Sequence, residues 1–283
     1  MEIPNRWRNS SPFFIWPLLF AVACSDEHGF HGSSSVVDSV PRELISIPGF
    51  ADPVSCMTHL LAAGVALVLG AIMILRFRGR KHHRLGITVF VAGTVFMFSM
   101  SGVYHMMGPD GMARYVMQHL DHAAIFVMIA GTMTAIHLLL FRGWKRWGVI
   151  IFIWIATVNG IVFKTIWFDE FPEWLGLTIY LMMGWMGLVT VALVVRKMGL
   201  RPARTLVFGG ISYSVGAVIE FARPPFLIPG VFGPHEVFHL AVIGGVMFHW
   251  RFLGHAIERV RFDRTTPLTI TGAPLEGTPN EAH

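Results

Sequence analysis

The chain has 283 residues, of which 54% are hydrophobic and 14% are charged, and its mean hydropathy is +0.59. A soluble domain carries about 25% charged residues, so this composition excludes an ordinary soluble protein. The formal charge of +5 does not indicate a nucleic-acid partner, because the basic residues lie at the ends of apolar blocks, as topology signals of membrane proteins do.

The first 24 residues have the pattern of a targeting segment. Two arginines open it, residues 12–20 form an apolar stretch that is short for a membrane span, and residues 21–23 give the small residues of a cleavage site. We therefore expect 1–24 to be a signal peptide, with an uncleaved N-terminal apolar segment as the alternative. Residues 25–50 are polar and predict an extramembrane lead-in.

Seven apolar blocks follow, and each is long enough to cross the hydrocarbon core as a helix of about 20 residues. They predict an all-α membrane protein, a seven-transmembrane helix bundle over residues 51–257. The tail at 258–283 is polar and rich in Gly and Pro, so we expect it to be disordered. The predicted spans are 54–75, 85–105, 121–141, 148–167, 174–195, 206–222 and 235–257.

The basic residues alternate between the two sides of these spans. Lysine and arginine gather after the first, third, fifth and seventh spans, whereas the other connections hold little beyond Arg114 and Arg223. An excess of Lys and Arg marks the cytoplasmic side. We therefore expect a multi-pass protein of the plasma (inner) membrane, with its N-terminus outside and its C-terminus in the cytoplasm. A signal peptide would deliver the same orientation.

Several polar side chains lie at one face of this predicted bundle. With seven spans, the end of the second and the starts of the third and seventh share that face. Ser101 and His105 are four residues apart, as are His235 and His239, so each pair shares one side of a helix. With Asp121 at the start of the third span, these groups could converge on one point.

The chemistry of these groups favours a metal site. A polar side chain within a span is costly and normally faces a partner inside the bundle. The cysteines Cys24 and Cys56 are too few for a cysteine-rich site, so histidines and carboxylates must hold any metal. Three histidines suit zinc and leave a fourth tetrahedral position for water. Asp121 could accept a hydrogen bond from that water, and Ser101 could do likewise.

A simpler interpretation needs no metal. The chain has fourteen histidines, and a pair four residues apart in a helix is more often a buried hydrogen-bonding pair. We expect His59, His137 and His249, which lie within spans, to be hydrogen-bonded packing groups. Glu220 and Glu236 could support a metal ligand or face water.

Five stretches together resemble the hemolysin III family, which is grouped with the adiponectin and progestin receptors and, more distantly, with the alkaline ceramidases. The resemblance covers about residues 45–255, and the order and spacing of its motifs make it specific. The stretches are DPVSCMTH at 52–59, SGVYH at 101–105, LDHAAIFVMIAGT at 120–132, YLMMGW at 180–185 and HEVFH at 235–239.

The resemblance implies seven helices around a zinc ion, with His105, His235 and His239 as its ligands. Asp121 would act through the metal-bound water, with Ser101 nearby. Because the ceramidase branch hydrolyses lipid amides, it implies an intramembrane hydrolase of a lipid amide or ester bond, with a membrane lipid as substrate. The family usually places its N-terminus in the cytoplasm, whereas the basic connections here indicate the reverse orientation.

Three other functions remain open at this point. The protein could be a lipid-sensing receptor in which zinc is structural. It could form a pore, as the family name suggests, although its spans carry few aligned polar residues. Its histidine pairs could instead bind haem.

Overall fold

A computed structural model describes residues 45–108, 111–167, 173–225 and 227–265, all within a compact unit that begins at Pro41. The predicted signal peptide, most of the predicted lead-in and residues 266–283 lie outside the described residues.

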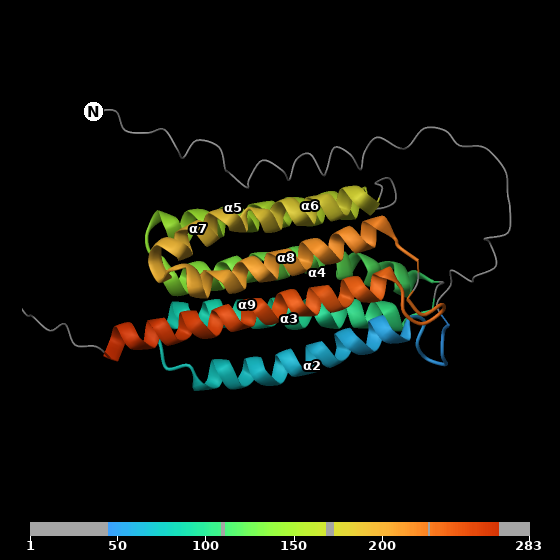
Figure 1. Ribbon diagram of the computed structural model, residues 1–283, viewed down its shortest axis with the longest axis horizontal. Helices are drawn as coiled ribbons and strands as arrows, with labels where there is room; N and C mark the ends of the chain where they lie inside the picture. The colour runs from blue at the N-terminus through green and yellow to red at the C-terminus, as the bar shows by residue number, and fades with distance from the viewer. Residues whose placement is uncertain (1–44, 109–110, 168–172, 226, 266–283) are drawn as a thin grey trace, which may run out of the picture. The chain divides into compact units, whose positions relative to one another are not determined.

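The described residues form eight helices, drawn in Figure 1. Seven candidate spans are long and apolar enough to cross a membrane, and α6 and α7 share one of them, Trp174–Met198. This confirms the predicted seven-helix membrane protein. The helices are α2 (Pro53–Arg76), α3 (Lys81–Met106), α4 (Met112–Leu140), α5 (Trp144–Ile166), α6 (Glu173–Trp185), α7 (Gly187–Met198), α8 (Leu200–Ala222) and α9 (Pro234–Thr265).

Several helices differ from their predicted bounds, and α8 begins at Leu200 rather than at 206. Helix α4 begins at Met112, so Asp121 lies well inside it rather than at its start, and α9 continues past Ile257 to Thr265. In both cases polar residues continue the helix beyond its apolar stretch, and hydropathy alone does not register them. The predicted fifth span is interrupted at Met186, between α6 and α7, where Gly184 and Gly187 lower the helix propensity.

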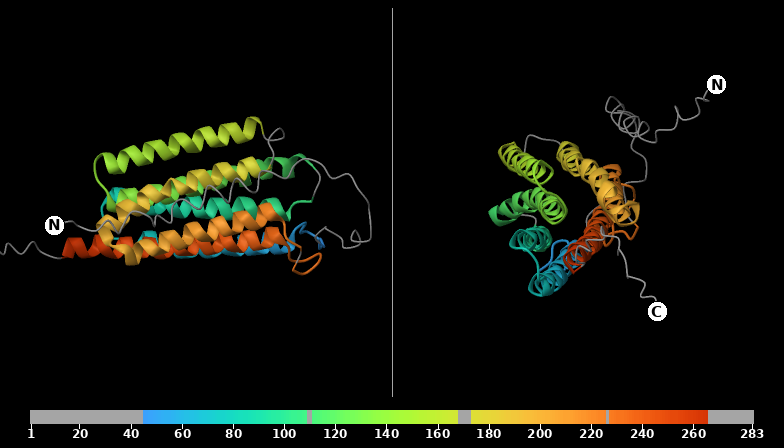
Figure 2. Two further views of the ribbon diagram at one scale, coloured as in Figure 1. Left: turned by 45° about the horizontal axis from the view of Figure 1, so that its top comes forward. Right: turned by 90° about the vertical axis from the view of Figure 1, so that its left-hand side faces the viewer.

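Helix α4 is the most enclosed of the spans. Its most apolar stretch is 72% buried, against 17% in α5, so α4 packs inside the bundle while α5 presents apolar side chains to lipid. Helix α3 packs along both α2 and α4, and α8 packs along α9. Figure 2 shows these helices side by side with roughly parallel axes.

Glycines bring α3 and α4 close together. A Cβ atom on Gly131 would lie 3.1 Å from the carbonyl oxygen of Val89, and one on Gly93 would lie 3.3 Å from that of Val127. Small residues allow this close backbone approach between membrane helices. The contact holds the last turns of α3, which carry Ser101 and His105, against the part of α4 that carries Asp121.

Candidate metal centre

Three histidines from two helices meet at one end of the bundle. His105 lies in the last turn of α3, and His235 and His239 lie in the first two turns of α9, which begins at Pro234. One ring nitrogen from each lies within 4.8 Å of the others. His105 and His239 are buried, and His235 is partly exposed. The predicted histidines are therefore together and could hold a metal ion.

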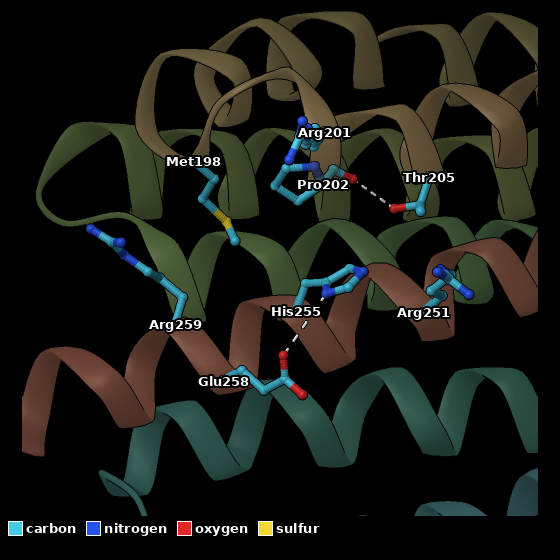
Figure 3. Close-up of a pocket in the computed structure, with 8 residues that line it drawn as sticks. All are labelled: Met198, Arg201, Pro202, Thr205, Arg251, His255, Glu258 and Arg259. Carbon is cyan, nitrogen blue, oxygen red and sulfur yellow. Dashed lines mark hydrogen bonds and ion pairs between the residues drawn. The ribbon is translucent and has the colours of Figure 1, made fainter.

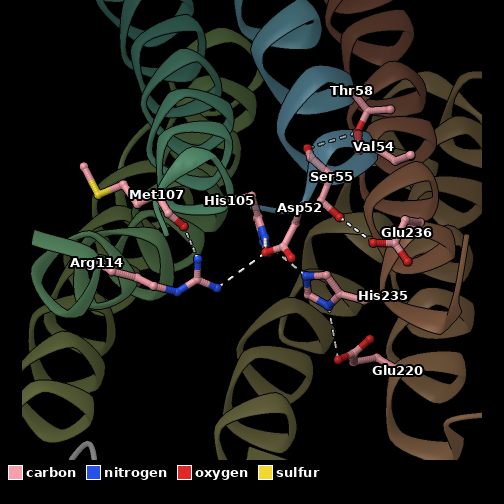
Figure 4. A network of polar contacts seen from close by, with 10 residues as sticks. All are labelled: Asp52, Val54, Ser55, Thr58, His105, Met107, Arg114, Glu220, His235 and Glu236. Carbon is pink, nitrogen blue, oxygen red and sulfur yellow. Dashed lines mark hydrogen bonds and ion pairs between the residues drawn. The ribbon is translucent and has the colours of Figure 1, made fainter. Parts of the chain in front are cut away.

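Asp52, the residue just before α2, holds the ring of His105. Its Oδ2 atom lies 2.9 Å from Nδ1 of His105 and 3.4 Å from the guanidinium of Arg114 (Figure 4). The backbone is tied at the same place, because the Asp52 N–H donates to the carbonyl oxygen of His105 at 3.0 Å. The end of α3 and the start of α2 are thus joined through main chain and side chain.

The Asp52 carboxyl is ionised in this setting. Burial by itself would raise its pKa, but the hydrogen bond from His105 and the positive charge of Arg114 outweigh burial and hold the pKa below its usual value of 3.8. An ionised carboxylate only accepts hydrogen bonds. We therefore place the proton of His105 on Nδ1, which leaves a lone pair on Nε2.

Glu220, near the end of α8, plays the same part for His235. Its Oε1 atom lies 3.2 Å from Nδ1 of His235. With the Nδ1 proton directed at Glu220, His235 also has a lone pair on Nε2. Figure 4 shows the rings of His105 and His235 between their two carboxylates.

The two Nε2 atoms face each other at 3.2 Å. Two neutral imidazoles that present lone pairs at this distance repel, unless a proton or a metal ion lies between them. Two nitrogens bound to one tetrahedral zinc ion, with bonds of about 2.0–2.1 Å, lie about 3.4 Å apart. The observed distance therefore fits shared metal ligation, and metal-binding histidines usually have this kind of carboxylate partner.

The two predicted catalytic residues also lie at this place. Ser101 is buried one turn before His105, and its hydroxyl contacts the carboxylate of Asp121. Asp121 also interacts electrostatically with His235. The structure thus brings Ser101, Asp121 and the three histidines together, and their roles stay predictions.

Other buried polar atoms near the histidines need partners. Within the described residues, the Tyr180 hydroxyl, Oε2 of Glu220 and Nδ1 of His239 are buried without a hydrogen bond. Tyr180 also interacts electrostatically with Asp121. A buried polar group without a partner costs about 1–3 kcal/mol, so these atoms suit a place that takes up water or a polar ligand group.

His59 differs from the sequence-based expectation. We expected a hydrogen-bonded packing group, but neither ring nitrogen has a hydrogen bond within the described residues. Its ring stacks on that of His239, with 3.8 Å between the ring centroids, and lies edge-on to Phe98. The same expectation is confirmed for His137, which bonds Thr190 and the backbone of Lys145, and for His249, which bonds the backbone of Gly245.

The carboxylates that support the histidines were only partly found from the sequence. Asp52 belongs to one of the family motifs, but the sequence did not predict that it contacts a histidine. Helix parity does place it at the same membrane face as His105. Glu220 was left between two alternatives, and the structure places it 3.2 Å from His235, one of the predicted ligands. Glu236 accepts hydrogen bonds from the Ser55 hydroxyl at 2.9 Å and from the Gly233 backbone at 2.8 Å, which fastens α2 to α9.

Comparison with known proteins agrees with this architecture. A family model described as haemolysin-III related matches residues 50–250. Hemolysin-3 of Bacillus cereus is 29% identical over 196 residues, which cover 68% of this chain and 84% of the relative. The Hemolysin-3 homolog of Bacillus subtilis (strain 168) is 28% identical over 159 residues, or 56% of this chain and 70% of the relative. The matched region spans most of the helical bundle and includes every histidine of the candidate centre, so the chain belongs to the haemolysin-III-related family.

Proposed function

We propose that this protein binds one zinc ion through His105, His235 and His239 and hydrolyses an amide or ester bond of a membrane lipid. The observation that carries the proposal is the 3.2 Å approach of two Nε2 atoms whose Nδ1 atoms both face carboxylates. Bound zinc would supply Lewis-acid chemistry, in which it polarises a carbonyl group and makes water a better nucleophile.

The donor set favours zinc over the other groups considered. Three imidazole nitrogens that converge on one centre suit a tetrahedral ion whose fourth position stays open. Haem takes its axial ligands on opposite faces of a flat ring, which suits three converging imidazoles poorly. The carboxylates of Asp52 and Glu220 complete the arrangement, because they orient the rings and increase the basicity of the ligand nitrogens.

Asp121 is the proposed proton acceptor and donor. It interacts with His235 and with the Ser101 hydroxyl, so its carboxylate is held beside the ligands without being one of them. A base in this position can take the proton of the attacking water and later return it to the leaving group. The buried hydroxyl of Tyr180 has no hydrogen-bond partner within the described residues, so in this proposal it donates a hydrogen bond to the substrate.

An apolar groove supports a lipid as the substrate. The groove has a volume of about 500 Å³ and lies between α5 and α6, toward the end of the bundle where the histidines meet. Its wall includes Ile179, next to Tyr180, and Phe163. Hydrocarbon chains partition into such surfaces, so this groove is where we propose that an acyl chain of the substrate lies.

The orientation of the chain is part of the proposal. Basic residues gather in the connections after α2, α4 and α7 and at the end of α9, which favours a cytoplasmic location for these connections in the inner membrane. The histidines lie at the opposite end of the bundle. The reaction would therefore take place near the outer leaflet.

A second candidate, a lipid-sensing receptor with a structural zinc ion, shares the same ligands. It is favoured by the way Glu236 and Asp52 tie α2 to the helices that carry the histidines, because zinc would then lock three helices together. The two candidates differ in whether Asp121 carries out chemistry. A pore is suggested only by the hemolysin name, which belongs to the relatives. The apolar interior around α4 gives no support to an aqueous pore.

The zinc ligands can be tested by elemental analysis. We expect about one zinc ion per chain in detergent-purified protein, and loss of that zinc in His235→Ala/His239→Ala because two of three ligands are removed. His249→Ala is the control, since His249 lies on the same helix and its ring bonds the backbone of Gly245 in that helix. A folded wild type that takes up no added zinc, or a double variant that keeps it, would contradict the proposal.

The orienting role of Asp52 predicts a weaker but not abolished affinity. Asp52→Ala removes the acceptor for the Nδ1 proton of His105, and loss of such a partner typically lowers metal affinity about 10–100-fold. Competition with a chromophoric chelator measures this change, with Glu258→Ala as a carboxylate control at the other end of α9. An unchanged zinc affinity in Asp52→Ala would show that Asp52 does not orient the ligand.

The hydrolytic role of Asp121 predicts loss of turnover with retention of zinc. In a screen of lipid amides and esters in mixed micelles, we expect Asp121→Ala to be about 10²–10⁴-fold slower than wild type, because general acid–base catalysis contributes that much. Zinc content should stay the same. Unchanged turnover would remove Asp121 from the mechanism, and zinc-loaded wild type without any hydrolysis would favour the receptor.

A further inference from the structure

A second groove, lined by charged side chains, lies at the end of the bundle opposite the histidines. It has a volume of about 680 Å³ and is bounded by the end of α7, the start of α8 and the last turns of α9 (Figure 3). Its lining combines three arginines with one histidine and one glutamate. The lining residues are Met198, Arg201, Pro202, Thr205, Arg251, His255, Glu258 and Arg259.

The groove has an excess of positive charge. Glu258 is the only carboxylate in its lining, and its Oε2 atom lies 3.9 Å from Nδ1 of His255. Arg201 and Arg251 make no hydrogen bond or ion pair with any residue that the structure describes, and both are exposed. Figure 3 shows the imidazole of His255 between the arginines, which stand around the opening.

These side chains suit an anion that offers two or more oxygens, such as a phosphoryl group. The guanidinium of arginine presents parallel N–H donors that match two oxygens of a phosphate or carboxylate. Arg201 also stands in the first turn of α8, a 23-residue helix whose N-cap, Gly199, provides no side-chain hydrogen bond. The positive end of the helix dipole at that turn adds to the attraction for an anion.

The position of the groove matches the depth of lipid headgroups. Arg201 lies at the beginning of the span Leu200–Ala222, and Arg259 lies near the end of the span Pro234–Arg261. Arg251 lies roughly two helical turns deeper in that span than Arg259, so its long side chain must extend toward the headgroups. The ends of spans meet the polar headgroup region, where the phosphates of phospholipids are found. Met198 and Pro202 give the groove an apolar edge beside these charges.

We propose that this groove binds a phosphoryl group, carried by an anionic phospholipid headgroup or by a soluble phosphate compound. The proposal is independent of the metal centre. Lysine and arginine elsewhere at this end, such as Arg196 and Lys197, are exposed but do not line the groove. A general attraction of basic residues to the membrane would involve both sets equally, whereas a built site depends on Arg201 and Arg251.

The test compares two double variants of the full chain with the same loss of charge. Arg201→Gln/Arg251→Gln removes two groove guanidiniums, and Arg196→Gln/Lys197→Gln removes two charges outside it. Native mass spectrometry from detergent counts bound phosphatidylglycerol against phosphatidylcholine. In a separate arm, inorganic phosphate is titrated at constant ionic strength with chloride as the reference, and the melting temperature is recorded.

We expect the groove variant to bind phosphatidylglycerol at least about tenfold more weakly than wild type, while the matched control stays within about twofold, since each charge-assisted bond accounts for a decade or more in affinity. That result assigns the groove to a lipid headgroup. Stabilisation of wild type by inorganic phosphate, lost only in the groove variant and without a lipid preference, assigns it to a soluble phosphate. Equal behaviour of both variants in both arms overturns the proposal.

Discussion

The candidate centre depends on one contact, the approach of two imidazole nitrogens to 3.2 Å inside a membrane protein. Each ring has its other nitrogen directed at a carboxylate, Asp52 or Glu220, so both facing nitrogens hold lone pairs. Such a pair repels unless a proton or a metal ion lies between the two nitrogens. A third histidine, His239, lies within 4.8 Å of the same point, which makes a metal ion the group that suits the contact best.

Five of the described helices contribute residues to the site around this contact. Helices α3 and α9 carry the histidines, the start of α2 and the end of α8 carry the orienting carboxylates, and α4 carries Asp121. Glycines at the α3–α4 contact and the Ser55–Glu236 hydrogen bond fix the distances between these helices. The zinc proposal and the hydrolase proposal therefore rest on the same packing. The arginine groove at the far end of α8 and α9 does not, so each can be tested without the other.

Much of this could be predicted from the sequence because the membrane limits the choices. Long apolar blocks must be spans, and the parity of seven spans brings Ser101, His105, Asp121, His235 and His239 to one face. The support of the site was harder to predict, because Asp52 and Glu220 meet their histidines across different helices and no spacing in the chain encodes such contacts. Hydropathy likewise placed the start of α4 too late, since Arg114 and His119 continue the helix as polar residues. His59 was expected to make hydrogen bonds, but its packing on His239 decided otherwise.

The most direct test of the centre is the X-ray absorption spectrum of the protein at the zinc edge. We expect a first shell of nitrogen and oxygen at about 2.0–2.1 Å, with the outer-shell scattering of three imidazole rings. His249→Ala should give the same spectrum, and any variant of the three ligands should lose imidazole scattering. A first shell with sulfur at about 2.3 Å, or one without imidazole scattering, would contradict the ligand set proposed here.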